Sequence, residues 1–336
     1  MSFCGFLSCW YWFASWLIRK KTTSGERIMT FTRADTVNVA ILVFLSCIWG
    51  TAFAAIKIAV LDIGPFGVAA ARALIGGLTL FVFLILIGSP AWRVKKSLLT
   101  AQNLRILFFI GLVGTLAPFF LISWAETRLD SNLVGLLIST GPLITALGGH
   151  FITGEEEVSP ARFGAISLGF LGVIVLMYEG VLQVGSMSLM AQLAVVLASG
   201  CYAAGNLVAW RLTMIEPAKL ACLSLLIAAS FMIPTAFLND VPHPASWQAD
   251  TWWALCWLGM ISSGFAFSLR YVLIKRAGAG FMANVGYLIP VVAVLVGGFF
   301  LGESIGIEKL VAMALIITSV ILSQRFAVRL KRKHPE

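Results

Sequence analysis

The sequence contains few charged residues and shows no metal-binding pattern. Charged residues make up 12% of the 336-residue chain, and only three residues are His. Because a soluble domain carries about one-quarter charged residues, this composition argues against a soluble globular class. The six Cys show no CxxC or other metal-ligand spacing. We therefore expect buried free thiols and neither a metal nor a cofactor.

Carboxylates are absent from the middle of the long apolar runs. Intramembrane enzymes use paired Asp, a Gly-x-Ser-Gly with a His, or clusters of metal ligands, and none of these patterns occurs here. Ser262-Ser263-Gly264 has no His partner within the apolar segments. The chain is therefore not expected to be an enzyme. A small-multidrug exchanger needs a buried acid in its first span, where this chain has Lys57, so anions and zwitterions suit it better than hydrophobic cations.

Long apolar runs fill most of the chain, of which 60% is hydrophobic. Each run is about 20 residues long, enough for a helix to cross a hydrocarbon core of about 30 Å. None of them shows the alternation of a barrel strand. We predict an all-α integral membrane protein with ten spans near 37–60, 65–88, 104–125, 131–152, 160–179, 189–211, 218–238, 252–274, 279–301 and 307–326.

A duplication organises these spans. The segment Gly111–Glu155 matches Gly259–Glu303 at a constant offset of 148 residues and without a gap. Each copy has two apolar runs joined by a polar corner, and the second run carries a Pro and ends in Gly-Glu. The unit is too long for a solenoid repeat and is typical of half of a duplicated membrane domain.

The basic residues predict how the chain is oriented. Most of the 24 Lys and Arg fall in alternate loops and at the two ends, which the positive-inside rule places in the cytoplasm. The net charge of +9 is thus a topology signal and does not indicate nucleic-acid binding. With five spans in each half, the second half is inverted relative to the first. We expect a monomer in the inner membrane with both termini cytoplasmic. A receptor or assembly subunit would need no such inverted duplication.

The chain is divided into four parts. Residues 1–36 form an N-terminal extension whose apolar start is followed by Arg19-Lys20-Lys21. Three interpretations of this extension stay open: an interfacial segment, a short extra span, or an extension ahead of a start at Met29. The last is favoured. Residues 37–180 form the first repeat and residues 181–326 the second. Residues 327–336 are a basic cytoplasmic tail.

Several motifs resemble a known family. Trp49-Gly50-Thr-Ala-Phe53-Ala-Ala-Ile-Lys57, Arg72 and the repeated Pro, eleven residues, Gly-Glu element are similar to the ten-span, EamA-type members of the drug/metabolite transporter superfamily. The resemblance covers about residues 37–325. It implies an inner-membrane carrier whose cavity is lined by spans 1, 3, 4, 6, 8 and 9, with spans 5 and 10 at the side. Aromatic amino-acid exporters have the most similar layout.

Basic side chains at membrane depth are the first candidates for substrate contact, since each needs a partner or a wet cavity. Arg72 lies furthest from a span end and is predicted to attract a substrate carboxylate, to form a gating ion pair or to bond backbone carbonyls. Lys57 lies near an end, where it is predicted to contact substrate, reach outward or pair with Asp62. Arg270, near the cytoplasmic end of its span, is interpreted as structural.

Aromatic and small polar residues complete the predicted site. With the two basic residues, the substrate-binding set is Lys57, Arg72, Trp124, Thr140, Tyr202, Asn206, Phe267, Tyr271, Asn284 and Tyr287. Such a mixture favours a small organic zwitterion or anion, such as an amino acid. Glu126 and His150 are candidates for proton coupling, and facilitated transport without coupling stays open. A proton-coupled multidrug carrier or a nucleotide or sugar carrier of the same fold is the alternative. Glu155 and Glu303 are interpreted as helix-capping groups.

Overall fold

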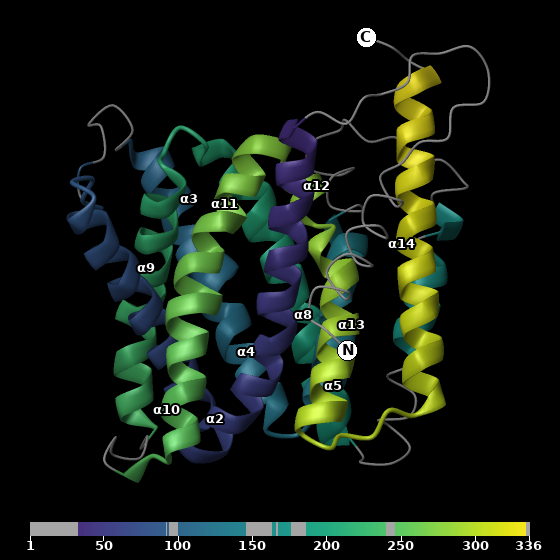
Figure 1. Ribbon diagram of the computed structural model, residues 1–336, viewed down its shortest axis with the longest axis horizontal. Helices are drawn as coiled ribbons and strands as arrows, with labels where there is room; N and C mark the ends of the chain where they lie inside the picture. The colour runs from purple at the N-terminus through teal and green to yellow at the C-terminus, as the bar shows by residue number, and fades with distance from the viewer. Residues whose placement is uncertain are drawn as a thin grey trace.

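The computed structural model describes residues 33–91, 93, 100–145, 163–165, 167–175, 186–239 and 246–333. The predictions for residues 1–32, His150 and Glu155 lie outside this part, as does the side chain of Tyr287. In the described residues every regular element is helical (Figure 1). Five helices there are long and apolar enough to cross a membrane, and shorter apolar helices accompany them. The prediction of an all-helical membrane protein is confirmed, while the ten inverted spans stay a prediction.

The elements follow the predicted apolar runs. In chain order they are α2 (Arg33–Leu86), α3 (Ala101–Gly111), η2 (Leu112–Leu116), α4 (Ala117–Glu126), α5 (Ser131–Leu137), η3 (Ile138–Thr140), α8 (Ser186–Ala209), η4 (Trp210–Leu212), α9 (Pro217–Leu238), α10 (Ala249–Cys256), η6 (Trp257–Phe265), α11 (Ala266–Ala277), α12 (Ala279–Met282), α13 (Val285–Phe300) and α14 (Ile307–Lys333).

Helix α2 contains two predicted spans joined at a corner. Its 54 residues would extend about 80 Å as one straight helix, far more than a bilayer core. The corner is Gly64, where φ is +69°, a conformation that a side chain disfavours. Pro65 follows it and begins the second helix, because proline lacks the N–H that a first turn leaves unbonded. Lys57 and Arg72 therefore belong to two different helices that meet at this corner.

Two π-helical stretches occupy equivalent places in the duplicated sequence. One is η2, and the other is η6, which covers the positions 148 residues later. A π-helix widens the helix by one residue per turn and shifts the direction of the side chains beyond it. The shift leaves the Ser262 carbonyl oxygen bonded to the Trp49 indole N–H at 3.0 Å. The irregularity thus brings polar groups of η6 to α2.

Glycine brings helices of the two halves into contact. A Cβ atom built on Gly205 of α8 would lie 2.7 Å from the Cα of Gly114 in η2, closer than such atoms approach each other. Only glycine at both positions permits this distance, as in other closely packed membrane helices. Helix α14 lies at one edge of the molecule (Figure 1). It packs on the helical residues 167–175, where Gly172 faces Ala312 and Ile316.

Glu303 caps a helix of the other half, as the sequence interpretation expected. Its two carboxylate oxygens accept the backbone N–H groups of Ser131 at 2.8 Å and Asn132 at 2.9 Å, at the start of α5. These N–H groups have no partner inside their own helix, and the positive end of the helix dipole favours the anion. Lys309 adds a bond to the side chain of Asn132 at 3.0 Å. The turn after α13 is thereby tied to the corner between α4 and α5.

Candidate functional site

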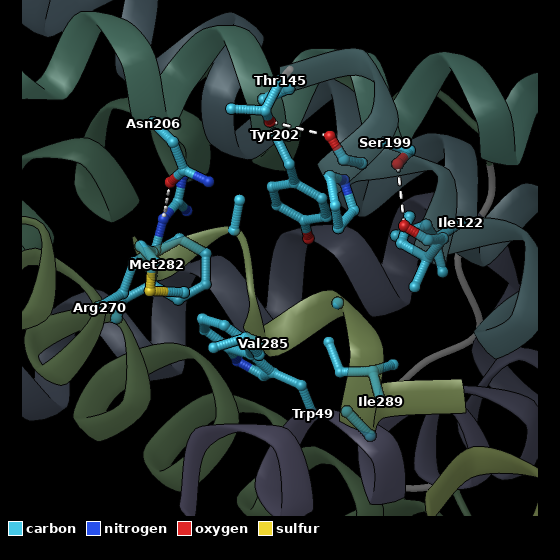
Figure 2. Close-up of a pocket in the computed structure, with 18 of the residues that line it drawn as sticks. Trp49, Ile122, Thr145, Ser199, Tyr202, Asn206, Arg270, Met282, Val285 and Ile289 are labelled. Carbon is cyan, nitrogen blue, oxygen red and sulfur yellow. Dashed lines mark hydrogen bonds between the residues drawn. The ribbon is translucent and has the colours of Figure 1, made fainter. Parts of the chain in front are cut away.

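A cavity lies at the centre of the helices that the family resemblance names. Its volume is about 110 Å³, several times the minimum that a single water molecule needs. Most of the wall is apolar. The polar side chains on it are Arg72, Thr145, Ser199, Tyr202, Asn206 and Arg270, with the indole of Trp49. In Figure 2, Asn206, Arg270 and Met282 stand at one side and Ile122 at the other.

Arg270 is the most deeply buried cation on this wall, with 2% of its surface exposed. Its Nε donates to the side-chain oxygen of Asn206 at 2.6 Å (Figure 2). Its Nη2 has no hydrogen-bond partner among the described residues. The guanidinium lies over the rings of Phe267 and Tyr271, at 5.0 and 5.3 Å from their centroids. The ring faces hold the charge in place beside the cavity.

Arg72 reaches the cavity from α2 and is 3% exposed. Its Nε donates to the hydroxyl of Ser263 at 3.2 Å, so the irregular helix η6 sets its direction. The guanidinium lies 3.8 Å from the centre of the Phe119 ring. The hydrogen bond described for Arg72 goes to a side chain and not to a backbone carbonyl. The side chain lines the cavity.

An aromatic wall connects the two arginines. The rings of Phe119 and Phe267 meet edge to face with their centroids 5.6 Å apart, and each ring lies under one guanidinium. Trp49 stands against Phe267 at 6.2 Å. Of these rings, Phe267 and Trp49 line the cavity and provide apolar contact for a ligand, while the two cations attract a negative group.

Neither arginine forms a direct ion pair within the described part of the chain, although the buried Glu126 acts on Arg72 from a distance. The ion pairs found there join Lys219 to Glu216 and Lys309 to Asp130, and none of these residues lines the cavity. A buried cation without an anion is costly in a low-dielectric interior, and an anionic ligand removes that cost. The cavity is therefore electrostatically suited to a small molecule with a negative group and an apolar part.

The predicted substrate-binding residues divide into two groups. Arg72, Tyr202, Asn206 and Phe267 line the cavity. The other described ones do not line it. Lys57 donates from Nζ to the carbonyls of Glu126 and Leu129 at 2.9 and 2.8 Å, the Trp124 ring lies under Arg128, and Thr140 is bonded to the Leu137 carbonyl. Tyr271 lies near the Ser224 hydroxyl and lines a smaller pocket, and Asn284 directly precedes α13.

Sequence reasoning did not anticipate the position of Arg270. The interpretation counted its depth from a span end at residue 274, but α11 continues to Ala277 and carries the residue deeper. The aromatic pair Phe267 and Tyr271, one turn apart on the same helix, flanks Arg270 and was the available signal. Trp49 was noted only as part of a motif, and its place on the cavity wall depends on contacts with distant helices.

The coupling candidate Glu126 is fully buried, with no exposed surface. Neither carboxyl oxygen has a hydrogen-bond partner among the described residues. It does not line the cavity but follows Ile122, which does, by one helical turn.

Comparison with known proteins places the chain among transporters. Residues 37–178 and 189–324 each match the EamA-like transporter family. The chain is 21% identical over 283 residues to the "uncharacterized transporter YoaV" of Bacillus subtilis (84% of this chain, 94% of the relative). It is 23% identical over 279 residues to the "uncharacterized inner membrane transporter YedA" of Escherichia coli K12 (83% and 87%).

Another relative carries a more specific name. It is the "probable terminal-alkyne amino-acid exporter" of Streptantibioticus cattleyicolor, 26% identical over 300 residues (87% of this chain, 95% of the relative). A solved structure titled only "Crystal structure of protein" superposes with a TM-score of 0.64 at 20% identity, covering 87% of this chain and 99% of the other. This likeness concerns the fold. With both halves matched, the chain is a multi-pass membrane protein that belongs to the EamA-like transporter family.

Proposed function

We propose that this transporter exports amino acids or similar small zwitterionic or anionic metabolites across the inner membrane. The observation that carries the proposal is the pair of buried arginines, Arg72 and Arg270, on the wall of an aromatic cavity. A carboxylate bound there satisfies the guanidinium groups, and the rings of Phe267 and Trp49 contact the apolar part of the molecule. The relative named as an amino-acid exporter supports the same substrate class.

Transport proceeds by alternating access around this cavity. The two matched halves are expected to lie in opposite orientations, and exchanging their conformations opens one central site to each side in turn. Both termini are then cytoplasmic. A tag accessible only from outside the cell at either terminus contradicts this orientation.

The experiment is counterflow in proteoliposomes with a panel of amino acids, organic acids, sugars, nucleotides and organic cations. We expect exchange of solutes that carry a carboxylate, and loss of that exchange in Arg270→Gln. Arg128→Gln is the matched control, because this arginine is exposed and lies over Trp124, away from the cavity. Exchange of sugars, nucleotides or cations in place of carboxylates refutes the proposal in favour of another carrier of this fold.

A further inference from the structure

Glu126 is a buried acid at a position that does not need one. The residue 148 positions later in the duplicated sequence is Ile274, which is also buried, with 1% of its surface exposed. An apolar side chain thus fills the equivalent position in the other copy. Glu126 occupies its own position with both carboxyl oxygens unbonded among the described residues. Packing alone does not account for a carboxyl group here.

The residue lies just beyond one end of the cavity. Ile122 and Glu126 share a face of α4, because residues four apart are neighbours on a helix, and Ile122 lines the cavity. Next to Ile56 of that wall, Lys57 donates from Nζ to the backbone carbonyls of Glu126 and Leu129. This lysine ties α2 to the corner between α4 and α5. In this conformation Glu126, which ends α4 at this corner, has no exposed surface.

The charged groups that act on Glu126 come from two neighbouring segments. Lys57 and Arg72 of α2 are cations, and Glu303 in the turn after α13 is an anion. None of them is bonded to its carboxyl oxygens: Lys57 is engaged by carbonyls, Arg72 by Ser263, and Glu303 by the start of α5. On the other neighbouring elements, Asp130 before α5 pairs with Lys309, and Tyr202 of α8 interacts with Arg72.

An ionised carboxylate without hydrogen bonds is strongly disfavoured in such an interior, whereas the neutral acid is tolerated. We propose that Glu126 is a proton-binding site that couples the closure of this end of the cavity to pH. With the corner closed, the carboxyl group holds its proton. When the corner opens, the acid loses one proton to water on that side, and the carboxylate is stabilised by water and by Lys57. The proposal rests on the alternating access proposed above.

The direction of the pH effect follows from this difference in protonation. Because the closed state binds one more proton than the open state, acid favours closure. Over the range in which Glu126 is neutral when closed and ionised when open, the ratio of closed to open molecules changes about tenfold per pH unit.

The first test is infrared difference spectroscopy on the full-length protein in lipid nanodiscs. We expect wild type minus Glu126→Gln to show one protonated-carboxyl stretching band at neutral pH that disappears in alkali. Absence of this band at neutral pH means that Glu126 is ionised, as in a permanent ion pair with Lys57, and overturns the proposal.

The second test measures opening of the corner. Ser131 is buried there with 1% exposure, and Ser131→Cys is nearly isosteric. With the six native Cys replaced by Ala, the rate at which a maleimide modifies the S131C thiol reports opening. At each pH, this rate is divided by the rate measured in the same protein carrying Glu126→Gln. The ratio no longer contains the pH dependence of the thiol's reactivity.

We expect the normalised rate to rise with pH, and Glu126→Asp to keep this dependence. A ratio that is constant with pH overturns the proposal. Neither measurement uses a transported solute. A carrier that proves to move another class of substrate therefore leaves both results unchanged, and failure of the proton site is distinguishable from failure of the proposed function.

Discussion

Arg270 and Ile122 occupy equivalent positions in the two copies of the duplicated sequence, and both line the central cavity. One wall therefore carries a buried cation where the other carries an aliphatic side chain. The phenylalanines one turn before them, Phe267 and Phe119, are identical and contact each other. The duplication thus preserved this aromatic contact beside the cavity, while the buried cation at this repeat position belongs to one copy.

Removing that charge is expected to weaken binding of a carboxylate substrate. Loss of one partner of a buried charge pair costs about 2–5 kcal/mol, which corresponds to about 30-fold weaker binding or more. We expect this loss in Arg270→Gln, measured by isothermal titration calorimetry with a solute that exchanges in counterflow. Arg270→Lys keeps the charge but loses the fork of N–H groups, and should bind with intermediate affinity. Unchanged affinity in Arg270→Gln contradicts the assignment.

Asn206→Asp tests whether substrate binding depends on the charge of Arg270 or only on the size of its side chain. The substitution is isosteric and places a carboxylate beside Nε, where the amide oxygen now accepts a bond at 2.6 Å. The resulting internal ion pair competes with the substrate. We expect carboxylate exchange to fall about as far as in Arg270→Gln, without loss of thermal stability. Exchange at the wild-type rate in proteoliposomes shows that Arg270 does not bind the substrate.

The contact between Gly114 and Gly205 is expected to limit stability. Gly205→Ala places a methyl group 2.7 Å from backbone of the neighbouring helix, and such overpacking costs about 1–3 kcal/mol. We expect a lower midpoint of thermal unfolding in detergent. Gly200→Ala on the same helix is the matched control, since its added methyl group comes no closer than 3.9 Å to Ile144. Equal midpoints for the two variants contradict the close contact.

The cap that Glu303 forms on α5 should contribute measurably to stability. Glu303→Gln leaves one oxygen for two N–H groups and removes the charge, and loss of a cap costs about 0.5–2 kcal/mol. We expect faster hydrogen exchange at the backbone N–H groups of Ser131 and Asn132, measured by mass spectrometry in nanodiscs. Glu308→Gln, at the start of α14, is the control. Protection at these two positions equal to that of the wild type argues against the cap.

The spans and the duplication could be read from the amino-acid order alone. Lipid requires every backbone group to be bonded within its own helix, so each span is a local run of apolar residues, visible without knowledge of its neighbours. The Gly-Glu ending before Glu303 is a local signal for a corner, but the helix that Glu303 caps begins 172 residues away in the chain and could not be read from it. Pro65 after Gly64 likewise marks a corner between two apolar runs.

The site required the tertiary structure. Whether Lys57 contacts the substrate or the carbonyls of Glu126 and Leu129 depends on a helix about 70 residues away. Arg270 is held beside the cavity by a bond to Asn206 on another helix. The sequence by itself determined a duplicated, helical membrane protein of a transporter family. Only the packing of the helices decided which cations are buried beside the cavity and which carboxyl is enclosed without a partner, because those properties depend on groups distant in the chain.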